Sequence, residues 1–309
     1  MTTTLHVDLT NVGDLPVFSR EQARGWGISD RDLAALCRRG SFRRLARGWY
    51  SSRMDATPEE LHVLRTVANI RLHAGRSVAV RHSAVLLHGL PLAKADLDIV
   101  ELARAGQGHG RIRAGVRESL LEGRPTTQVE LPDLGAGASL VTVPHAIVGT
   151  AQTNNPSAAL VAGDHALRLG LCTPAEIHEA LADAAGQTGV GQARLALAHL
   201  DGRHESPGET LTAVILRTLG WDVDPQVEVV AAGRLYRLDF ALRAYRVAIE
   251  FDGQVKYNDP AAHLAQERRE ADLRSVGWAF ARLGWDDLDD PAILGGRIRS
   301  AIAELDPVA

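Results

Sequence analysis

Two acidic residues end an apolar stretch of the sequence, "RVAIEFDGQVKY" (residues 246–257). If this stretch is a β-strand, Glu250 and Asp252 point to the same face, because side chains alternate along a strand. The preceding stretch "LYRLDFAL" alternates in the same way and places Asp239 on its polar face. A short turn near "RAY" joins the two stretches, so we expect a hairpin on which the three carboxylates converge. Such carboxylates repel one another unless a positive charge lies between them.

These acids have two interpretations. Oxygen ligands without histidine or cysteine favour Mg²⁺ or Mn²⁺, so the first is a metal site. In it, Gly253 lets the chain turn sharply, and Lys256 places a positive charge where negative charge develops during a reaction. The second is a solvated hairpin face, on which Arg237 and Arg246 are the cross-strand partners of the acids.

A helix with clear boundary signals precedes the hairpin, in "SPGETLTAVILRTLG" (206–220). Ser206 is its expected N-cap, and Gly220 lies past its end. Glu209 completes a capping box, which by itself accounts for this residue. After the hairpin we expect a charged helix in "HLAQERREADLRSVG", a strand in "WAFARLGW" and a helix in "PAILGGRIRSAIAEL". These elements predict an α/β domain over residues 201–309.

Residues 205–304 resemble the very-short-patch-repair-like (Vsr-like) branch of the PD-(D/E)XK nuclease superfamily. The resemblance is carried by "ESPGE", "YRLDFAL", "VAIEFDGQVKY" and "ERREADLRSVGWAFARLGWDDL", in this order. It implies a restriction-endonuclease-like α/β/α domain and a Mg²⁺- or Mn²⁺-dependent DNA endonuclease. The implied metal ligands are Asp239, Glu250 and Asp252, and the implied catalytic set adds Glu209 and Lys256. Asp252 stands where the superfamily usually has its motif lysine, so Lys256 is the implied replacement.

A basic segment near the N-terminus, "VFSREQARGWGISDRDLAALCRRGSFRRLARGWY" (17–50), predicts two short helices followed by a strand. Ser29 is a good N-cap for the second helix, which we expect at the DNA interface together with Ser29, and Gly40 ends this helix. This is the layout of a winged helix-turn-helix domain, expected over residues 1–55. Five arginines without an acid among them suit contacts with DNA phosphates: Arg38, Arg39, Arg43, Arg44 and Arg47. The alternative is a solvated charged surface on a small helical subdomain.

The same basic segment resembles the winged-helix domain at the start of AbiEi-type antitoxins. The stretches "RHSAVLLHGL" and "LVTVPHAIVGTA" resemble the segment that follows in such proteins. This second resemblance implies a non-catalytic DNA-binding transcriptional regulator, which is the alternative to a nuclease, and a toxin protein as partner. A winged-helix protein that binds a palindromic site would be a homodimer, although no residue pattern in this chain bears on that.

Residues 56–200 predict a mixed α/β region that carries no chemical motif. His82, His88, His109 and His145 have no metal-ligand spacing, so we expect structural or surface roles for them. The whole chain has 309 residues and a formal net charge of −4, which predicts a multi-domain α/β protein without a global basic signature. Any contact with DNA must therefore come from local patches.

Cysteine usage and hydropathy indicate the cellular compartment of the protein. Cys37 and Cys172 stand far apart without metal-type neighbours, which excludes a disulfide framework and suits a reducing cytoplasm. The first residues lack the pattern of a signal peptide, and no apolar run reaches membrane-spanning length. We therefore expect a cytoplasmic protein with no membrane partner.

Overall fold

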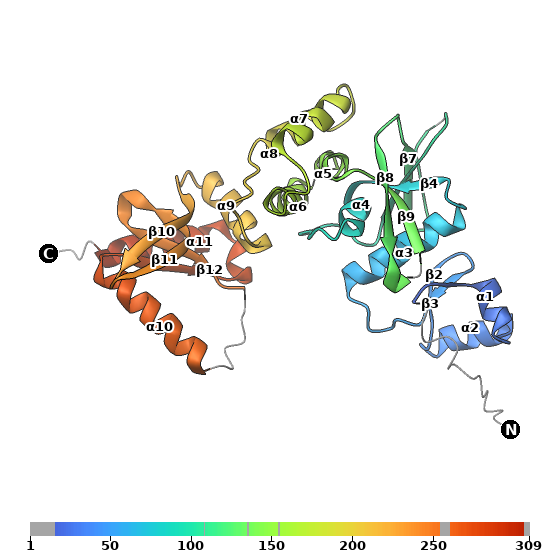
Figure 1. The fold of residues 1–309 in the computed structure, drawn as a ribbon, viewed down its shortest axis with the longest axis horizontal. Coiled ribbons are helices and arrows are strands. Elements are labelled where there is room, and N and C mark those ends of the chain that lie inside the picture. Colours follow the sequence, from blue (N-terminus) through green and yellow to red (C-terminus); the bar gives the residue numbers. More distant parts are fainter. Residues whose placement is uncertain (1–15, 108, 135, 154, 254–259, 306–309) are drawn as a thin grey trace. The chain divides into compact units, whose positions relative to one another are not determined.

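The computed structural model describes residues 16–305 except 108, 135, 154 and 254–259, and the protein is a multi-domain α/β protein (Figure 1). The chain forms two compact units. The first contains the described residues up to Ala162 together with Cys172–Ala198. The second contains Gly163–Leu171 and the described residues from His199 onward. In the described part of the chain, no helix is long and apolar enough to cross a bilayer.

The first unit begins with two short helices and a three-stranded sheet in the order β1-β3-β2. These elements are β1 (Phe18–Ser19), α1 (Arg20–Gly25), α2 (Asp30–Arg38), β2 (Arg43–Ala46) and β3 (Trp49–Ser51). Ser19 and Ser29 cap the two helices, as their residue types favour. One core holds the helices on the sheet and consists of Phe18, Ala23, Ile28, Leu33, Leu36 and Phe42. The expected helix, turn, helix and basic ribbon are therefore present.

A six-stranded sheet in the order β6-β7-β5-β4-β9-β8 follows, flanked by helices. Its elements are α3 (Pro58–Leu72), β4 (Ser77–Ala79), α4 (Arg81–Leu87), β5 (Val100–Arg104), β6 (Arg111–Arg113), β7 (Val116–Leu120), β8 (Thr126–Leu131), the 3₁₀ turn Pro132–Leu134, β9 (Ala136–Val141) and α5 (Val143–Ala151). Three further helices complete the region: α6 (Pro156–Arg168), α7 (Pro174–Asp183) and α8 (Val190–Leu197).

The hairpin β2–β3 packs on helix α3. Leu45 of β2 shares a core with Leu64 and Ala68 of α3. The guanidinium of Arg71 lies over the Trp49 ring, 5.4 Å from its centroid, and also donates hydrogen bonds to two main-chain carbonyls of neighbouring segments. The helix-turn-helix part and the six-stranded sheet therefore share α3 as a common support within the first unit.

The second unit is a four-stranded sheet with helices on its faces, in the order β10-β11-β12-β13. Its elements are α9 (Pro207–Thr218), β10 (Asp224–Ala231), β11 (Arg234–Leu242), the 3₁₀ turn Arg243–Tyr245, β12 (Val247–Phe251), α10 (Pro260–Ser275), β13 (Ala279–Leu283), the 3₁₀ turn Trp285–Leu288 and α11 (Pro291–Leu305).

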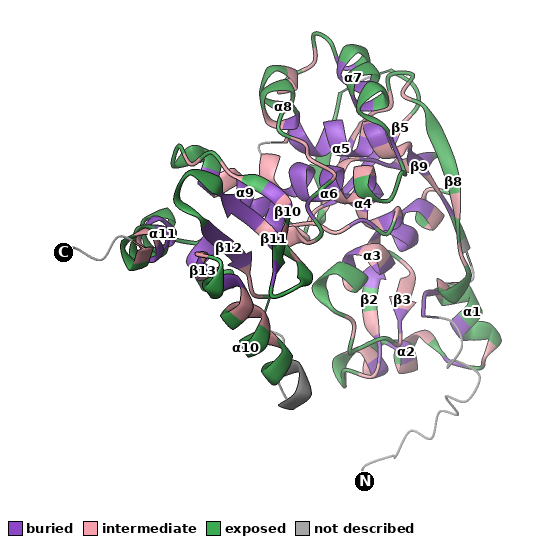
Figure 2. Cartoon of the chain, turned by 60° about the vertical axis from the view of Figure 1, so that its left-hand side comes forward, coloured by how far each residue is buried: buried purple, intermediate pink, exposed green. Residues whose placement is uncertain are grey.

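Helix α10 is the crossover of this sheet. Strands β10 to β12 are antiparallel neighbours, and β13 returns through α10 to pair with β12 in parallel orientation. Leu273 of α10 shares a core with Ala248 and Phe280 of these strands. Helices α9 and α11 also contact β12. Figure 2 shows the central strands largely buried and the outer sides of α10 and α11 exposed.

The second unit also includes the end of α6. The buried Asp164 accepts hydrogen bonds from the hydroxyl of Thr210 (2.9 Å) and the main-chain N of Asp201 (2.7 Å), and it pairs with Nδ1 of His204 (2.7 Å). His204 is only 4% exposed. Residues 202–209, whose composition suggests a linker, are therefore part of the packed unit.

Candidate functional site

The predicted hairpin is present as β11–β12, and the three acids meet at its end. The register pairs Phe240 with Ile249, so that the next residues along each strand, Asp239 and Glu250, are neighbours. They line a pocket of about 190 Å³, called here the acidic pocket, whose lining is Asp239, Glu250, Phe251, Asp252, Gly253, Gln266 and Arg282. Two strands, the segment after β12, helix α10 and β13 each contribute side chains to it.

Strict alternation, however, does not hold along β11. Leu238 shares a core with Ala248, whereas the Phe240 ring lies against His204, with ring centroids 5.6 Å apart. Gln226 lies between the two residues of β10 that pair with Phe240 and Leu238, and its φ of 55° is left-handed. A left-handed residue interrupts the regular pleat, which explains why the alternating pattern fails at the level of the acidic pocket.

Burial raises the pKa of Asp239 to about 6, and the negative charges of Glu209 and Glu250 act in the same direction. The main-chain N of Phe251 donates a hydrogen bond to Oδ2 of Asp239 (2.9 Å). This hydrogen bond and the charge of Arg269 lower the pKa without cancelling the increase. A carboxyl group in this condition is typical of a functional site, because a bound cation would relieve the repulsion.

Glu250 is 8% exposed and is held by Arg269 of α10. Nη1 of Arg269 donates to Oε2 of Glu250 (2.8 Å), and Nη2 donates to the carbonyl of Arg237 (2.8 Å). Oε1 of Glu250 lies 2.5 Å from Nη2 as an ion-pair contact, but it is buried and accepts no hydrogen bond of good geometry from the described residues. Both oxygens of Glu250 therefore contact the guanidinium of Arg269.

The prediction that Arg237 and Arg246 are the cross-strand partners of the acids is wrong. Arg237 donates to Glu205 (2.6 Å), and Arg246 donates to the carbonyl of Val276 (3.4 Å). The partner of Glu250 is Arg269 instead, which comes from a helix that crosses over the sheet between β12 and β13. Alternation along two strands carries no information about that helix, although the cluster of charges in "ERREADLR" was a signal for it.

Asp252 lines the acidic pocket and is half-buried. Its main-chain N donates to the carbonyl of Leu283 (2.7 Å), which ties the segment after β12 to β13. The carboxylate of Asp252 has no ion-pair or hydrogen-bond partner among the residues that the structure describes. Lys256 lies outside the described residues, so its role stays a prediction.

Glycine matters at this site, but at a different position from the one expected. Gly253 does not have a positive φ, and a Cβ there would meet the Phe251 ring at an ordinary 3.8 Å. The expectation that a sharp turn requires glycine at position 253 is therefore wrong. A Cβ on Gly208 would lie 2.0 Å from the ring of Phe251, so α9 can approach the end of β12 only because residue 208 has no side chain. The same ring meets Trp285 edge to face, with centroids 5.1 Å apart.

Glu209 is buried, and its carboxylate is occupied by local hydrogen bonds. It accepts from the main-chain N of Glu205 (2.9 Å), the hydroxyl of Ser206 (2.9 Å) and the side-chain amide of Gln226 (2.8 Å). Its main-chain N donates to the Ser206 hydroxyl (3.2 Å), so Ser206 is the N-cap of α9. Glu209 does not line the acidic pocket, but its charge raises the pKa of Asp239. Only half of the expected capping box is present, because the Glu209 carboxylate accepts from the main-chain N of Glu205 and not from that of Ser206. A metal-binding role of Glu209 stays a prediction.

The acidic pocket fits a hard divalent cation only in part. Its donors are oxygens, and Asp239 and Glu250 would supply two carboxylate ligands. Within the described residues, no group of three or more histidine, cysteine or acidic side chains is arranged as a metal site. The guanidinium of Arg269 already neutralises Glu250. A cation would thus bind beside this ion pair and take its remaining ligands from water, substrate or Asp252.

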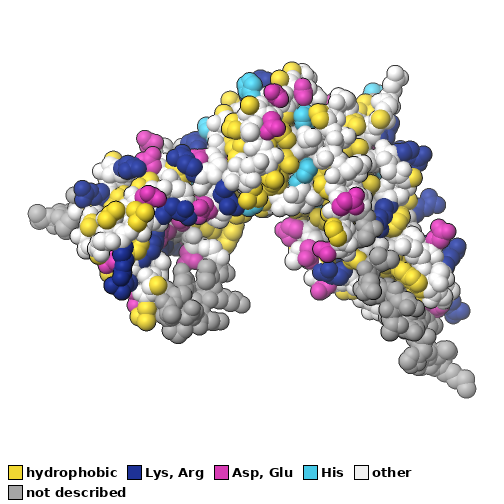
Figure 3. Space-filling model, viewed as in Figure 1, with side chains coloured by type: hydrophobic (Ala, Val, Ile, Leu, Met, Phe, Trp, Pro, Cys, Tyr) yellow, Lys and Arg dark blue, Asp and Glu magenta, His cyan; other side chains and the backbone are white. Residues whose placement is uncertain are grey.

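The basic segment of the first unit has very different surroundings. Arg38, Arg39, Arg44 and Arg47 are exposed, and Arg43 is half-buried. Arg43 and Arg44 donate only to main-chain carbonyls, and none of the five arginines has a carboxylate partner in the described part of the chain. Figure 3 shows Lys and Arg side chains along the right-hand edge of this unit.

Ser29, expected at the DNA interface, is occupied as a helix cap. Its hydroxyl accepts from the main-chain N of Asp32 (3.2 Å) and donates to the carboxylate of Asp32 (2.6 Å). Asp30, at the start of the same helix, pairs with Arg20 and Arg24, which hold its pKa well below the usual range. The positive charge of the basic segment that is free to meet phosphates therefore begins at the C-terminal end of α2, with Arg38, and does not lie before this helix.

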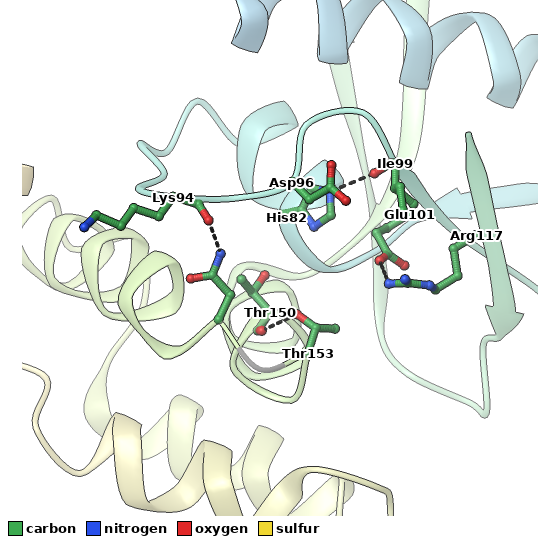
Figure 4. A pocket seen from close by; sticks show the side chains of 9 residues that line it. His82, Lys94, Asp96, Ile99, Glu101, Arg117, Thr150 and Thr153 are labelled. Atoms are coloured by element: carbon green, nitrogen blue, oxygen red, sulfur yellow. Dashed lines mark hydrogen bonds and ion pairs between the residues drawn. The ribbon is translucent and has the colours of Figure 1, made fainter. Parts of the chain in front are cut away.

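A second polar pocket, of about 320 Å³, lies in the first unit and includes His82 (Figure 4). The fully buried Glu101 accepts from Arg81 of α4 (3.0 Å) and from Arg117 of β7 (2.5 Å). Nε2 of His82 meets the carbonyl of Ile99 at 2.9 Å, and burial lowers the pKa of His82. The charges of Arg81, Glu101 and Arg117 are paired within the protein. These ion pairs join α4, β5 and β7 at the pocket.

The other histidines expected to be structural or at the surface are described too. Nε2 of His88 meets the carbonyl of Val141 at 2.8 Å, and His145 contacts Thr142 and Asp183 at 2.9 and 3.0 Å. His109 is exposed. These contacts fit structural or surface roles, and within the described residues no histidine belongs to a metal-type cluster.

No family model matches the chain. It is similar to two uncharacterized proteins of Mycobacterium tuberculosis, one from strain CDC 1551 / Oshkosh and one from strain H37Rv. Each is 32% identical over 144 residues, which is 45% of this chain and 53% of the relative. The chain thus spans about half the length of the curated relatives it matches, and neither relative supplies an activity.

Proposed function

We propose that this protein is a Mg²⁺- or Mn²⁺-dependent DNA endonuclease that its N-terminal winged helix holds on DNA. The observation that carries the proposal is the acidic pocket, where Asp239 and Glu250 from paired strands meet and the pKa of Asp239 is raised to about 6. Perturbed carboxyl groups in a pocket are typical of catalytic sites. The resemblance of residues 205–304 to Vsr-like nucleases supports the same reaction.

The roles follow from what each side chain contacts. Asp239 and Glu250 would hold the cation, which when bound polarises a phosphoryl oxygen and lowers the pKa of the attacking water. Arg269 would orient Glu250 through its ion pair and fix the position of that carboxylate at the end of β12. Asp252, whose carboxylate has no partner in the described residues, is placed to accept the proton of the water. Lys256 would stabilise the charge that develops on the phosphate.

The winged helix would supply affinity that the acidic pocket lacks. A pocket lined by three carboxylates repels a polyanion, whereas arginines without carboxylate partners can replace the counterions of a phosphate backbone. The proposed division of labour places DNA binding at Arg38, Arg39, Arg43, Arg44 and Arg47, and hydrolysis in the second unit. A cytoplasmic location and DNA as partner belong to this proposal.

Cleavage of purified DNA tests the proposal. Supercoiled, linear and single-stranded DNA, with single-stranded RNA alongside, would be incubated with the protein in Mg²⁺, Mn²⁺ or chelator. We expect metal-dependent cleavage of DNA, reduced by about 100-fold or more in Glu250→Gln, because one ligand and its charge are lost. Glu228→Gln removes an exposed acid from the neighbouring strand β10 and should cleave like the wild type.

The second candidate function is a DNA-binding regulator of the AbiEi type, with a toxin protein as partner and a homodimer as its binding form. It is favoured by the ion pair that already neutralises Glu250 and by the lack of a three-ligand metal group in the described residues. The same experiment separates the two functions. Salt-dependent DNA binding without cleavage of any substrate, with either metal, would support the regulator and overturn the nuclease.

A further inference from the structure

A groove of about 390 Å³ in the first unit lies beside the turn of the β2–β3 hairpin. Its walls come from that turn, from the end of α3 and from the strands β6 and β7. Three arginines line it: Arg47 from the turn, and Arg111 and Arg113 from β6. Of these three, only Arg47 belongs to the basic segment that sequence patterns assign to DNA binding.

The charge in this groove is net positive. Arg47 and Arg113 are exposed, and neither has an ion-pair partner in the described part of the chain. Arg111 pairs with Glu118 (2.6 Å) but remains 55% exposed, whereas Glu118 is buried and also lies 3.5 Å from His73. Glu118, the one carboxylate among the described residues of the lining, is therefore already neutralised by its ion pair with Arg111.

Strand β6 is an edge strand, because it stands at one end of the sheet order and pairs with β7. All of its residues, Arg111 to Arg113, are exposed, including Ile112 at 59%. Arginines on an edge strand can serve to prevent aggregation. Their position beside Arg47 in one groove indicates a second use, since guanidinium groups from two elements can bind neighbouring phosphates.

The packing keeps this surface continuous. The β2–β3 hairpin is held on α3 by the core that contains Leu45, Leu64 and Ala68, and α3 also contacts β5 and β4 of the large sheet. The hairpin and β6 therefore belong to one packed unit rather than to two domains on a flexible linker. A phosphate backbone bound at Arg47 would meet Arg113, which lines the same groove.

We propose that β6 is a second DNA-contacting element, in which Arg113 and Arg111 bind phosphates of the same duplex that the winged helix holds. This inference rests on the proposed DNA binding and extends its footprint into the region of residues 56–200, which has no role in the sequence interpretation. The contact carries affinity and register without base recognition, because it is made to phosphates.

The test is the salt dependence of duplex DNA binding, measured by fluorescence anisotropy for the full chain and its variants. Each lost phosphate contact lowers the slope of log affinity against log salt by about 0.9. We expect this reduction in Arg113→Gln, the same reduction in Arg47→Gln, and a wild-type slope in Arg113→Lys. Arg194→Gln on α8, an exposed arginine without a carboxylate partner in the described residues, is the charge-matched control and should keep the wild-type slope.

The outcomes separate this inference from the function on which it rests. If Arg47→Gln lowers the slope and Arg113→Gln does not, the winged helix binds DNA and the role of β6 is overturned. If the wild type shows no salt-dependent binding to duplex DNA, both proposals fail. A slope that changes for single-stranded RNA but not for duplex DNA would also overturn the inference.

Discussion

Arginines around the acidic pocket and arginines in the basic segment have opposite surroundings. Around the acidic pocket, Arg237, Arg269 and Arg282 each bond a carboxylate, namely Glu205, Glu250 and Glu270. Within the described residues, the five arginines between Arg38 and Arg47 bond none. Formal charge is therefore a poor guide to what an arginine can do. Around the acidic pocket it is used to hold acids in place, and between Arg38 and Arg47 it is available to an external anion.

The same contrast explains why the proposed function needs both units. The acidic pocket concentrates negative charge, since the pKa of Asp239 is raised in part by Glu209 and Glu250. Such a pocket attracts a divalent cation but repels a nucleic acid until the cation is bound. An exposed basic surface on the same chain would offset that repulsion by raising the local concentration of substrate.

The largest expected effect on stability comes from removing a paired arginine. Arg269→Ala leaves Glu250 buried without its partner, so we expect the free energy of unfolding to fall by about 3 kcal/mol, measured by urea denaturation. Arg243→Ala is the control, because Arg243 and Asp224 form an exposed pair with side chains 64% and 54% exposed. Its loss should be about 1 kcal/mol or less. Equal losses in both variants would contradict the role given to Arg269.

Removing the unpaired arginines should weaken DNA binding and leave stability almost unchanged. In the triple variant Arg43→Gln, Arg44→Gln, Arg47→Gln we expect the salt slope of DNA binding to fall by about 3. Stability should stay within about 0.5 kcal/mol of the wild type, since these side chains hold no buried acid. A triple variant of arginines paired with carboxylates, Arg53, Arg203 and Arg243, makes the same change in net charge. If both triples weaken binding equally, pairing does not matter and the comparison fails.

Asp239 should lower stability at neutral pH. Its pKa in the folded protein, about 6, is above its ordinary value, so the folded state binds the proton more tightly than the unfolded state does. Its contribution is therefore favourable at low pH and is lost as the pH rises toward and past 6. We expect Asp239→Asn to raise the free energy of unfolding at pH 7.5 by on the order of 1–3 kcal/mol. Denaturation across pH 4–8 without metal checks this. A variant that is less stable at pH 7.5 would contradict it.

The smallest expected effect distinguishes a cap from a DNA contact at Ser29. Since its hydroxyl accepts from the main-chain N of Asp32, Ser29→Ala should cost about 1 kcal/mol of stability. The salt slope of DNA binding should not change, because an uncharged side chain displaces no counterion. Thermal denaturation and anisotropy on one preparation measure both quantities. A lower affinity at fixed salt with unchanged stability would show that Ser29 binds DNA directly.

Local signals predicted the local elements well. Ser29 and Ser206 begin helices as their residue types indicate, and the hairpin that brings Asp239 and Glu250 together follows from a short turn between two strands. Such features depend on neighbours in the sequence, so one sequence is enough to find them.

Non-local features were beyond that reasoning. The charge cluster around Arg269 was visible in the sequence, but its pairing with Glu250 and the need for glycine at position 208 were not, because each depends on a helix packing against a distant strand. The left-handed φ of Gln226, which interrupts the alternation opposite the acidic pocket, has no residue-type signal, since glutamine seldom adopts it. Sequence therefore identified the carboxylates, and the structure was needed to find what holds them.

The most direct test of the proposed division of labour is binding and cleavage of one duplex, measured together on wild type, Glu250→Gln and the Arg43, Arg44, Arg47 triple variant. The account predicts that Glu250→Gln keeps the salt slope and loses metal-dependent cleavage. It also predicts that the triple variant loses affinity at physiological salt and recovers cleavage at low salt and high protein concentration. Cleavage by Glu250→Gln at the wild-type rate, or no cleavage by the wild type with either metal, would contradict the account.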